Sequence, residues 1–253
     1  SMNAILLLKL LLVPGLIWVV TLAGRRWGPG VAGWLSAFPI VSGPILLILA
    51  LEQGPEFAAQ AAHGTLLAVL AILVFSIAYA WASRRRSWPD CLFIALCCYA
   101  LAVLGLRYVG GTLTVAYSSV IAALVLVPVA FPSVPRWTTT ARRGNDLPWR
   151  LISAALLVLL VSFGAPVLGP RWSGLLAMFP VMSTVLVAFS HRQSGADFAV
   201  RLLRGMVYGY YAFATFCLVL ALALPEFGIT AAFGLALAAA LPVHALAHRW
   251  MPR

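Results

Sequence analysis

The sequence predicts an all-α polytopic membrane protein with nine transmembrane helices, arranged as 4+1+4 inverted-topology repeats. Three observations support this prediction. Hydrophobic residues make up 63% of the 253 residues and charged residues only 9%, whereas a soluble domain is nearer half apolar and a quarter charged. The apolar residues form runs long enough to cross a bilayer, and two stretches of the chain match each other at a constant offset. This composition excludes a soluble enzyme and a secreted disulfide scaffold.

The predicted spans follow from run length and from the residues between the runs. A crossing needs about twenty predominantly apolar residues, and Gly and Pro are the strongest punctuation between such runs. Gly28-Pro29, Gly54-Pro55 and Gly169-Pro170 all lie at such breaks. The predicted spans are 4–24, 31–51, 58–82, 90–107, 112–132, 149–168, 172–190, 198–224 and 228–247.

The basic residues predict the orientation of these spans. If all runs cross, Arg107 and Arg171 lie on one side, Lys9 lies within the first run, and the rest of the 17 basic residues share the other side. Cytoplasmic loops carry an excess of Lys and Arg. We therefore expect an inner (plasma) membrane protein with its N-terminus outside and its C-terminus in the cytoplasm. Because this asymmetry also accounts for the net charge of +11, we expect no nucleic-acid partner.

The two halves of the chain carry an internal repeat. Residues 28–80 align without gaps with residues 169–221, an offset of 141. Both contain Gly-x-Leu-x-x-Phe-Pro-x-x-Ser, starting at Gly33 and at Gly174, and then Gly-x-x-Phe-Ala and a further glycine. An odd central helix places the second half upside down relative to the first, as in many secondary transporters. The predicted parts are a first four-helix repeat (4–107), a central helix (112–132), a cytoplasmic linker (133–148) and a second repeat (149–247).

The repeated segment resembles a known family. Gly174-Leu175-Leu176-Ala177-Met178-Phe179-Pro180, followed by Gly195 and a helix rich in aromatic residues, resembles the GlpM-like family of small four-helix inner-membrane proteins. Residues 31–80 resemble it more loosely. The resemblance implies a tandem fusion of two such units, whereas a single-unit relative would pair as an antiparallel dimer. It implies no catalytic residues.

The Phe-Pro-x-x-Ser motifs are the clearest candidate site. Proline removes a backbone N–H and clashes with the preceding turn, so each motif should bend its helix and free carbonyl groups. Discontinuous helices at symmetry-related places are the best sequence pointer to a transporter binding site. The alternative is a structural kink, because proline is common in membrane helices. The candidate substrate-binding residues from these motifs are Phe38, Pro39, Ser42, Phe179, Pro180 and Ser183.

Basic residues supply further candidates. The repeat places His63 opposite Arg204, each directly before a matched glycine. These two could attract a carboxylate or phosphate on opposite sides of the membrane. Alternatively, Arg204 snorkels to lipid phosphates. Lys9 lies about two turns inside the first span, where it either snorkels outward or contacts the substrate or a counter-ion.

Other chemistry is not indicated. All six acidic residues fall at span ends or in loops, which argues against a transporter driven by a buried carboxylate. No Walker loop, dinucleotide fingerprint, zincin helix or nucleophile elbow appears in a supporting context. We therefore expect no enzyme activity, no catalytic residue, no cofactor and no metal site.

These patterns favour a secondary transporter that works by alternating access. Its expected substrate is a small anionic or amphipathic solute or a lipid carrier. Its expected partners are membrane lipids, that small molecule and, in a homo-oligomer, further copies of the chain. The alternative is a non-transporting membrane scaffold or accessory subunit that binds a partner protein. A polar cavity that reaches the two prolines would favour the transporter, and tight packing between the repeats would favour the scaffold.

Overall fold

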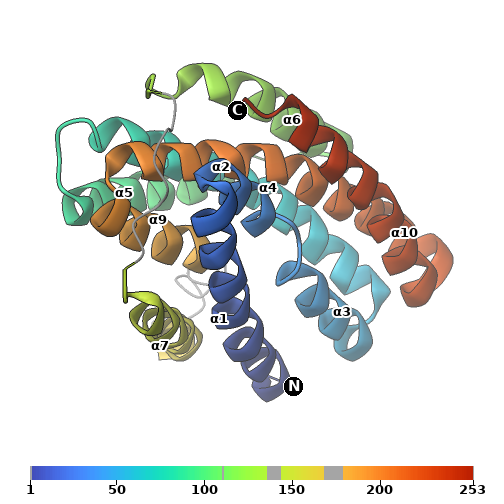
Figure 1. Ribbon diagram of the computed structural model, residues 1–253. Helices are drawn as coiled ribbons and strands as arrows, with labels where there is room; N and C mark the ends of the chain where they lie inside the picture. Colours follow the sequence, from blue (N-terminus) through green and yellow to red (C-terminus); the bar gives the residue numbers. More distant parts are fainter. Residues whose placement is uncertain (1, 110, 136–143, 168–178, 253) are drawn as a thin grey trace.

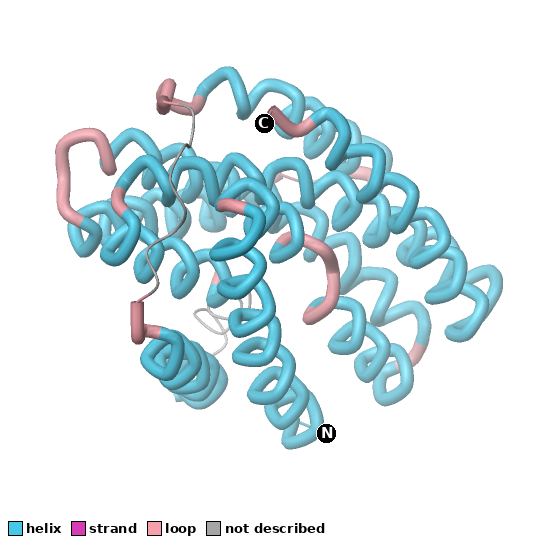
Figure 2. Tube along the Cα trace, in the orientation of Figure 1, coloured by secondary structure: helices cyan, strands magenta, loops and turns pink. Residues whose placement is uncertain are grey.

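The computed structural model describes residues 2–109, 111–135, 144–167 and 179–252, and over these ranges it contains helices and no strands. Figures 1 and 2 show the described helices packed as one bundle. The helices are α1 (Met2–Trp27), α2 (Pro29–Ser36), α3 (Ser42–Gln53), α4 (Pro55–Ala82), α5 (Trp88–Leu106), α6 (Leu113–Ala130), α7 (Leu147–Val167), α9 (Val181–Ser194) and α10 (Ala196–Trp250).

Within the described ranges, six helices are long and apolar enough to cross a membrane. They are α1, α4, α5, α6, α7 and α10. Large apolar side chains point outward from them: Phe93 is 71% exposed, Leu101 68% and Val129 85%. Exposure of such surface to water costs about 25 cal/mol per Å², and lipid removes this cost. The helices and their apolar exterior indicate a multi-pass membrane protein.

Some predicted spans take a different form in the structure. Residues 37–41 interrupt the run 31–51, which becomes α2 and α3. The runs 198–224 and 228–247 both lie in α10, whose backbone leaves the helical region at Gly228 (φ 79°); in Figure 1 its red end turns back along the bundle. The run 172–190 is described only from residue 179 onward, where it ends in α9. The nine crossings thus remain a prediction, because the bounds of interrupted and merged helices do not show how many times the chain crosses the membrane.

Helix boundaries recur at the offset of 141 residues. α3 and α9 each end directly before a matched glycine, Gly54 or Gly195, and α4 and α10 begin directly after it. These glycines adopt nearly the same backbone angles, φ 98° and ψ 163° at Gly54 and φ 91° and ψ 172° at Gly195. This region of conformational space is essentially restricted to glycine. The matched glycines therefore form the same sharp connection in both halves.

Alanine at either matched glycine should destabilise the protein by a similar amount. We expect Gly54→Ala and Gly195→Ala each to cost about 1–3 kcal/mol, because a Cβ strains this backbone conformation. Gly234→Ala is the control, since a Cβ there meets open space and the glycine has no positive φ; there alanine should be neutral or stabilising. Thermal unfolding of the purified protein in detergent measures all three. A large loss at one matched glycine and none at the other would contradict their equivalence.

The backbones of α2 and α10 are in direct contact. A Cβ on Gly33 would overlap the carbonyl oxygen of Leu202, and one on Gly205 would overlap the carbonyl oxygen of Gly30. One turn further along α10, a Cβ on Gly209 would lie 2.5 Å from the Trp34 carbonyl oxygen. Small residues at helix interfaces allow this close approach in membranes. Gly33 and Gly205, which both belong to the sequence repeat, thus allow the backbones of α2 and α10 to touch.

α1 and α7, which the sequence repeat aligns with each other, pack together in the bundle. Near the start of α7, the Arg150 guanidinium lies 3.4 Å from the Thr21 hydroxyl near the end of α1. Further along α7, Ser162 lines the same cavity as Lys9 in the first part of α1. α6 packs against α4 and α10, and the sequence repeat aligns α4 with the first part of α10.

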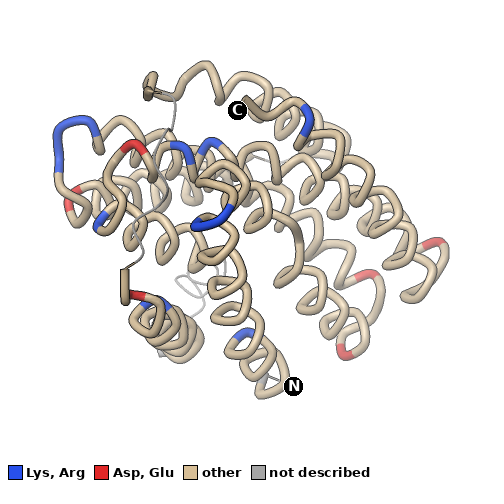
Figure 3. Tube along the Cα trace, in the orientation of Figure 1, with Lys and Arg blue, Asp and Glu red and all other residues tan. Residues whose placement is uncertain are grey.

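Basic residues gather towards one end of the bundle, where most of the blue segments of Figure 3 lie. Two carboxylates join them in ion pairs. Asp146 pairs with Arg150 at 2.9 Å and with Arg25 at 3.3 Å, and Asp197 pairs with Arg84 at 2.9 Å. The pairs of Arg25 and of Arg84 connect segments that are far apart in the sequence, whereas Asp146 and Arg150 are only four residues apart.

Candidate substrate-binding site

The two Phe-Pro motifs fold into matching turns at the start of α3 and of α9. Proline begins each turn, and Pro180 has φ −82° and ψ 72°, the angles of an inverse γ-turn. Two backbone hydrogen bonds recur at the offset of 141 residues. The N–H of Ile40 donates to the Phe38 carbonyl (2.7 Å) as that of Val181 does to Phe179 (2.9 Å), and the N–H of Gly43 donates to the Pro39 carbonyl (3.0 Å) as that of Thr184 does to Pro180 (3.0 Å). The bends expected from the sequence are therefore specific turns that start a new helix.

A cavity of about 560 Å³ lies between these turns. Its lining comes from α1, α2, α3, α4, α7, α9, α10 and the two Phe-Pro turns, so both halves of the chain contribute. The volume falls in the range of small-molecule sites, about 300–1,000 Å³. The structure brings together five of the candidate residues as lining: Phe38, Ser42, Phe179, Pro180 and Ser183.

The other three candidates lie outside this lining. Pro39 is buried, and its carbonyl accepts the hydrogen bond that starts α3. His63 is partly buried on α4, beside Gly64, which does line the cavity. Arg204 donates to the Pro132 carbonyl (3.3 Å) and lies 5.8 Å above the Phe131 ring. It thereby holds the chain after α6, and its role towards an anion stays a prediction.

Lys9 is the charged side chain of the cavity. No other Lys or Arg, and no Asp or Glu, appears in the lining that the described residues provide. Most of the wall is aliphatic or aromatic, and the remaining polar groups are hydroxyls: Ser36, Ser42, Thr65, Ser162, Ser183 and Tyr210. Ser36 and Thr65 donate to carbonyls of their own helices. An apolar wall with one ammonium group fits an apolar molecule that carries a single anionic group.

The sequence pattern contains a signal for Lys9 that extends the repeat beyond residues 28–80. At the same offset Lys9 corresponds to Arg150, and Thr21 corresponds to Ser162. Identical residues accompany these pairs at Leu6 and Leu147, Leu10 and Leu151, Leu16 and Leu157, and Val20 and Val161. The repeat therefore includes α1 and α7, and each carries one basic residue at the same position.

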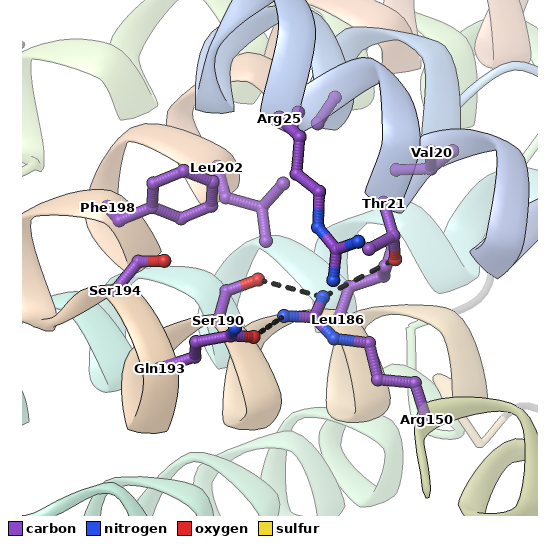
Figure 4. A pocket seen from close by; sticks show the side chains of 12 residues that line it. Val20, Thr21, Arg25, Arg150, Leu186, Ser190, Gln193, Ser194, Phe198 and Leu202 are labelled. Carbon is purple, nitrogen blue, oxygen red and sulfur yellow. Dashed lines mark hydrogen bonds between the residues drawn. The ribbon is translucent and has the colours of Figure 1, made fainter. Parts of the chain in front are cut away.

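Arg150 lies in a second, smaller pocket of about 20 Å³ (Figure 4). The residue is only 5% exposed, and its Nε donates to Asp146 at 2.9 Å. Its terminal nitrogens lie 3.4 Å from the Thr21 and Ser190 hydroxyls and from the Gln193 side-chain oxygen. This pocket is therefore closed around a guanidinium whose partners come from α1, α9 and the chain before α7.

Comparison with known families, curated proteins and solved structures found no match. The resemblance to the GlpM-like family therefore stays a prediction that depends on the repeated motif.

Proposed function

We propose that this protein is a secondary transporter that moves an amphipathic anion across the inner membrane by alternating access. The observation that carries the proposal is the cavity of about 560 Å³ lined by both Phe-Pro turns and by Lys9. Transporter sites of this type lie where discontinuous helices of two repeats meet. A scaffold whose repeats pack tightly has no need of such a cavity.

Inverted repeats are the second part of the proposal. Three features support them: the alignment of Lys9 on α1 with Arg150 on α7, the matching Phe-Pro turns, and the matched glycines before α4 and α10. The nine crossings follow if α2 with α3 forms one span, the run that ends in α9 forms another, and the two parts of α10 cross separately. In this arrangement the end rich in arginine faces the cytoplasm and the N-terminus lies outside.

The chemistry of the cavity defines the substrate class. An ammonium group in apolar surroundings is costly without a counter-charge, and the described lining offers no carboxylate. A substrate carboxylate or phosphate would supply that charge in a hydrogen bond worth about 1.5–3 kcal/mol. Its hydrocarbon part would bury apolar surface against residues such as Phe38 and Phe213.

Replacement of Lys9 should remove most of the affinity for anions. The probe is octyl phosphate, and octylammonium, with the same hydrocarbon chain and the opposite charge, is the matched control. Wild-type protein should bind and transport octyl phosphate in proteoliposomes and should not transport octylammonium. Lys9→Gln should weaken octyl phosphate binding by at least about tenfold, from the loss of a charge-assisted bond, whereas Lys9→Arg should largely retain it. Isothermal titration and uptake of labelled probe give the two readouts.

Two outcomes would contradict the proposal. Folded wild-type protein that neither binds nor transports the anion would favour the scaffold. Equal binding of octyl phosphate and octylammonium, unchanged by Lys9→Gln, would show that the cavity selects apolar surface and not charge.

A further inference from the structure

The two pockets occupy equivalent positions in the two halves of the chain. Six residues of the small pocket around Arg150 have their counterparts, at the offset of 141, in the lining of the large cavity. The pairs are Val20 and Val161, Thr21 and Ser162, Arg150 and Lys9, Leu186 and Ile45, Ser190 and Leu49, and Leu202 and Ala61. The counterparts of Gly24, Arg25 and Ala32 are residues 165, 166 and 173, whose side chains the structure does not describe.

These equivalent pockets differ in state. The one around Lys9 has a volume of about 560 Å³, and the one around Arg150 has about 20 Å³. The same contrast holds for the basic groups: Lys9 lines the open cavity, whereas Arg150 is held by Asp146 and by the polar side chains of Figure 4. The two pockets thus differ in volume and in how their basic residue is held.

We propose that Arg150 is a second binding residue for the anionic group of the substrate, used when the pocket around it opens. This inference depends on the proposed transport function and extends it to the opposite end of the bundle. When the two halves exchange conformations, the pocket around Lys9 closes and the pocket around Arg150 takes its open form. Arg150 then offers the anion a guanidinium, which binds carboxylates and phosphates through two parallel hydrogen bonds.

The two basic residues lie at different levels along α1. Arg150 lies beside Thr21, twelve residues after Lys9 on α1, so the two basic groups are separated by about 18 Å along that helix at 1.5 Å per residue. Serine, threonine and glutamine partners hold Arg150 at 3.4 Å, at the long end of hydrogen-bond distances. An incoming anion can replace these neutral partners and gain a charge-assisted bond.

Thiol accessibility at an equivalent pair of positions tests the exchange. Thr21→Cys reports on the pocket around Arg150, and Ser162→Cys reports on the cavity around Lys9, each in a chain whose native cysteines Cys91, Cys97, Cys98 and Cys217 are replaced by alanine. The reagent is a charged, membrane-impermeant methanethiosulfonate. In the conformation that the structure shows, the cysteine at residue 162 should react with the reagent and the cysteine at residue 21 should be protected.

Loosening the hold on Arg150 should reverse this pattern. Ser190→Ala combined with Gln193→Ala removes two neutral partners and leaves the Asp146 pair intact. We expect the reaction at residue 21 to accelerate by at least about fivefold and the reaction at residue 162 to slow by a similar factor, as for two coupled sites. Local loosening alone would raise the first rate without lowering the second, and that result would overturn the inference.

Transport by an Arg150 variant separates this inference from the proposed function. Arg150→Gln should still bind octyl phosphate through Lys9 but should lose at least about tenfold in its transport, and Arg150→Lys should restore part of it. If the wild-type protein transports octyl phosphate and folded Arg150→Gln transports it at the same rate, the role of Arg150 is overturned and the proposed function stands. Absence of binding and flux in the wild-type protein would overturn both. If Arg150→Gln does not fold, the thiol rates alone decide the question.

Discussion

Gly205→Val should abolish most of the folded protein. The Cβ of residue 205 would overlap the Gly30 carbonyl, which is backbone and cannot rotate away as a side chain would. Valine adds two methyl groups to the same place, so α2 must leave α10 or both helices must shift. Overpacking of a well-packed interior costs about 1–3 kcal/mol. We expect a loss of stability above about 3 kcal/mol, because the atoms that the valine side chain meets are backbone atoms of Gly30. The measurement is the yield of monodisperse protein and its unfolding temperature in detergent.

Gly15→Ala and Gly234→Ala are the controls for this substitution. Both glycines are exposed on helices, and a Cβ at either meets no atom within 4 Å. They should keep or slightly raise the unfolding temperature, because alanine favours helix by about 1 kcal/mol over glycine. If Gly205→Val behaved like these controls, α2 could not lie where the structure places it.

The contrast between Gly205 and the two exposed glycines, Gly15 and Gly234, shows how much of the fold the sequence predicts. The repeat singled out Gly205 and its match Gly64 from their spacing, and hydropathy located the long apolar helices. Spacing does not show what a glycine touches, because the partner backbone comes from α2, far away in the chain. The division of the run 31–51 could be anticipated at Pro39, since the chemistry of proline is local.

The candidate site was predictable to the extent that symmetry defines it. The Phe-Pro motifs pointed to two turns, and the structure places side chains of both on one cavity. The place of Arg204 was not predictable, because its partners Phe131 and Pro132 follow the central helix and come near only in the folded bundle. The equivalence of Lys9 and Arg150 was present in the sequence. It was hidden because leucine-rich segments such as α1 and α7 match at many offsets. In addition, a lysine aligned with an arginine does not count as an identical pair.

Asp146→Asn should have the second large effect, because it leaves the Arg150 charge without its anion. Arg150 is 5% exposed and donates to Asp146 at 2.9 Å. Removing one partner of a buried ion pair costs about 3–5 kcal/mol, and we expect the lower value because the Asp146 side chain is 20% exposed. Arg25 keeps a partner in the Gly144 carbonyl at 2.9 Å. Thermal unfolding should show a fall of about 6–12 °C, at 2–4 °C per kcal/mol for a chain of this length.

A control ion pair and a double variant show whether the destabilisation comes from the unpaired Arg150 charge or from the loss of the carboxylate. Asp197→Asn breaks the Arg84 ion pair, which has the same length of 2.9 Å but side chains that are 26% and 42% exposed; it should cost at most about 1 kcal/mol. Asp146→Asn combined with Arg150→Gln removes both charges and should recover most of the stability, because the cost arises from a stranded cation and not from a lost attraction. A double variant as unstable as Asp146→Asn alone would instead assign the stability to the carboxylate. The pocket around Arg150 would then be held closed by Asp146 independently of the guanidinium, and an anion that reached Arg150 would not open it.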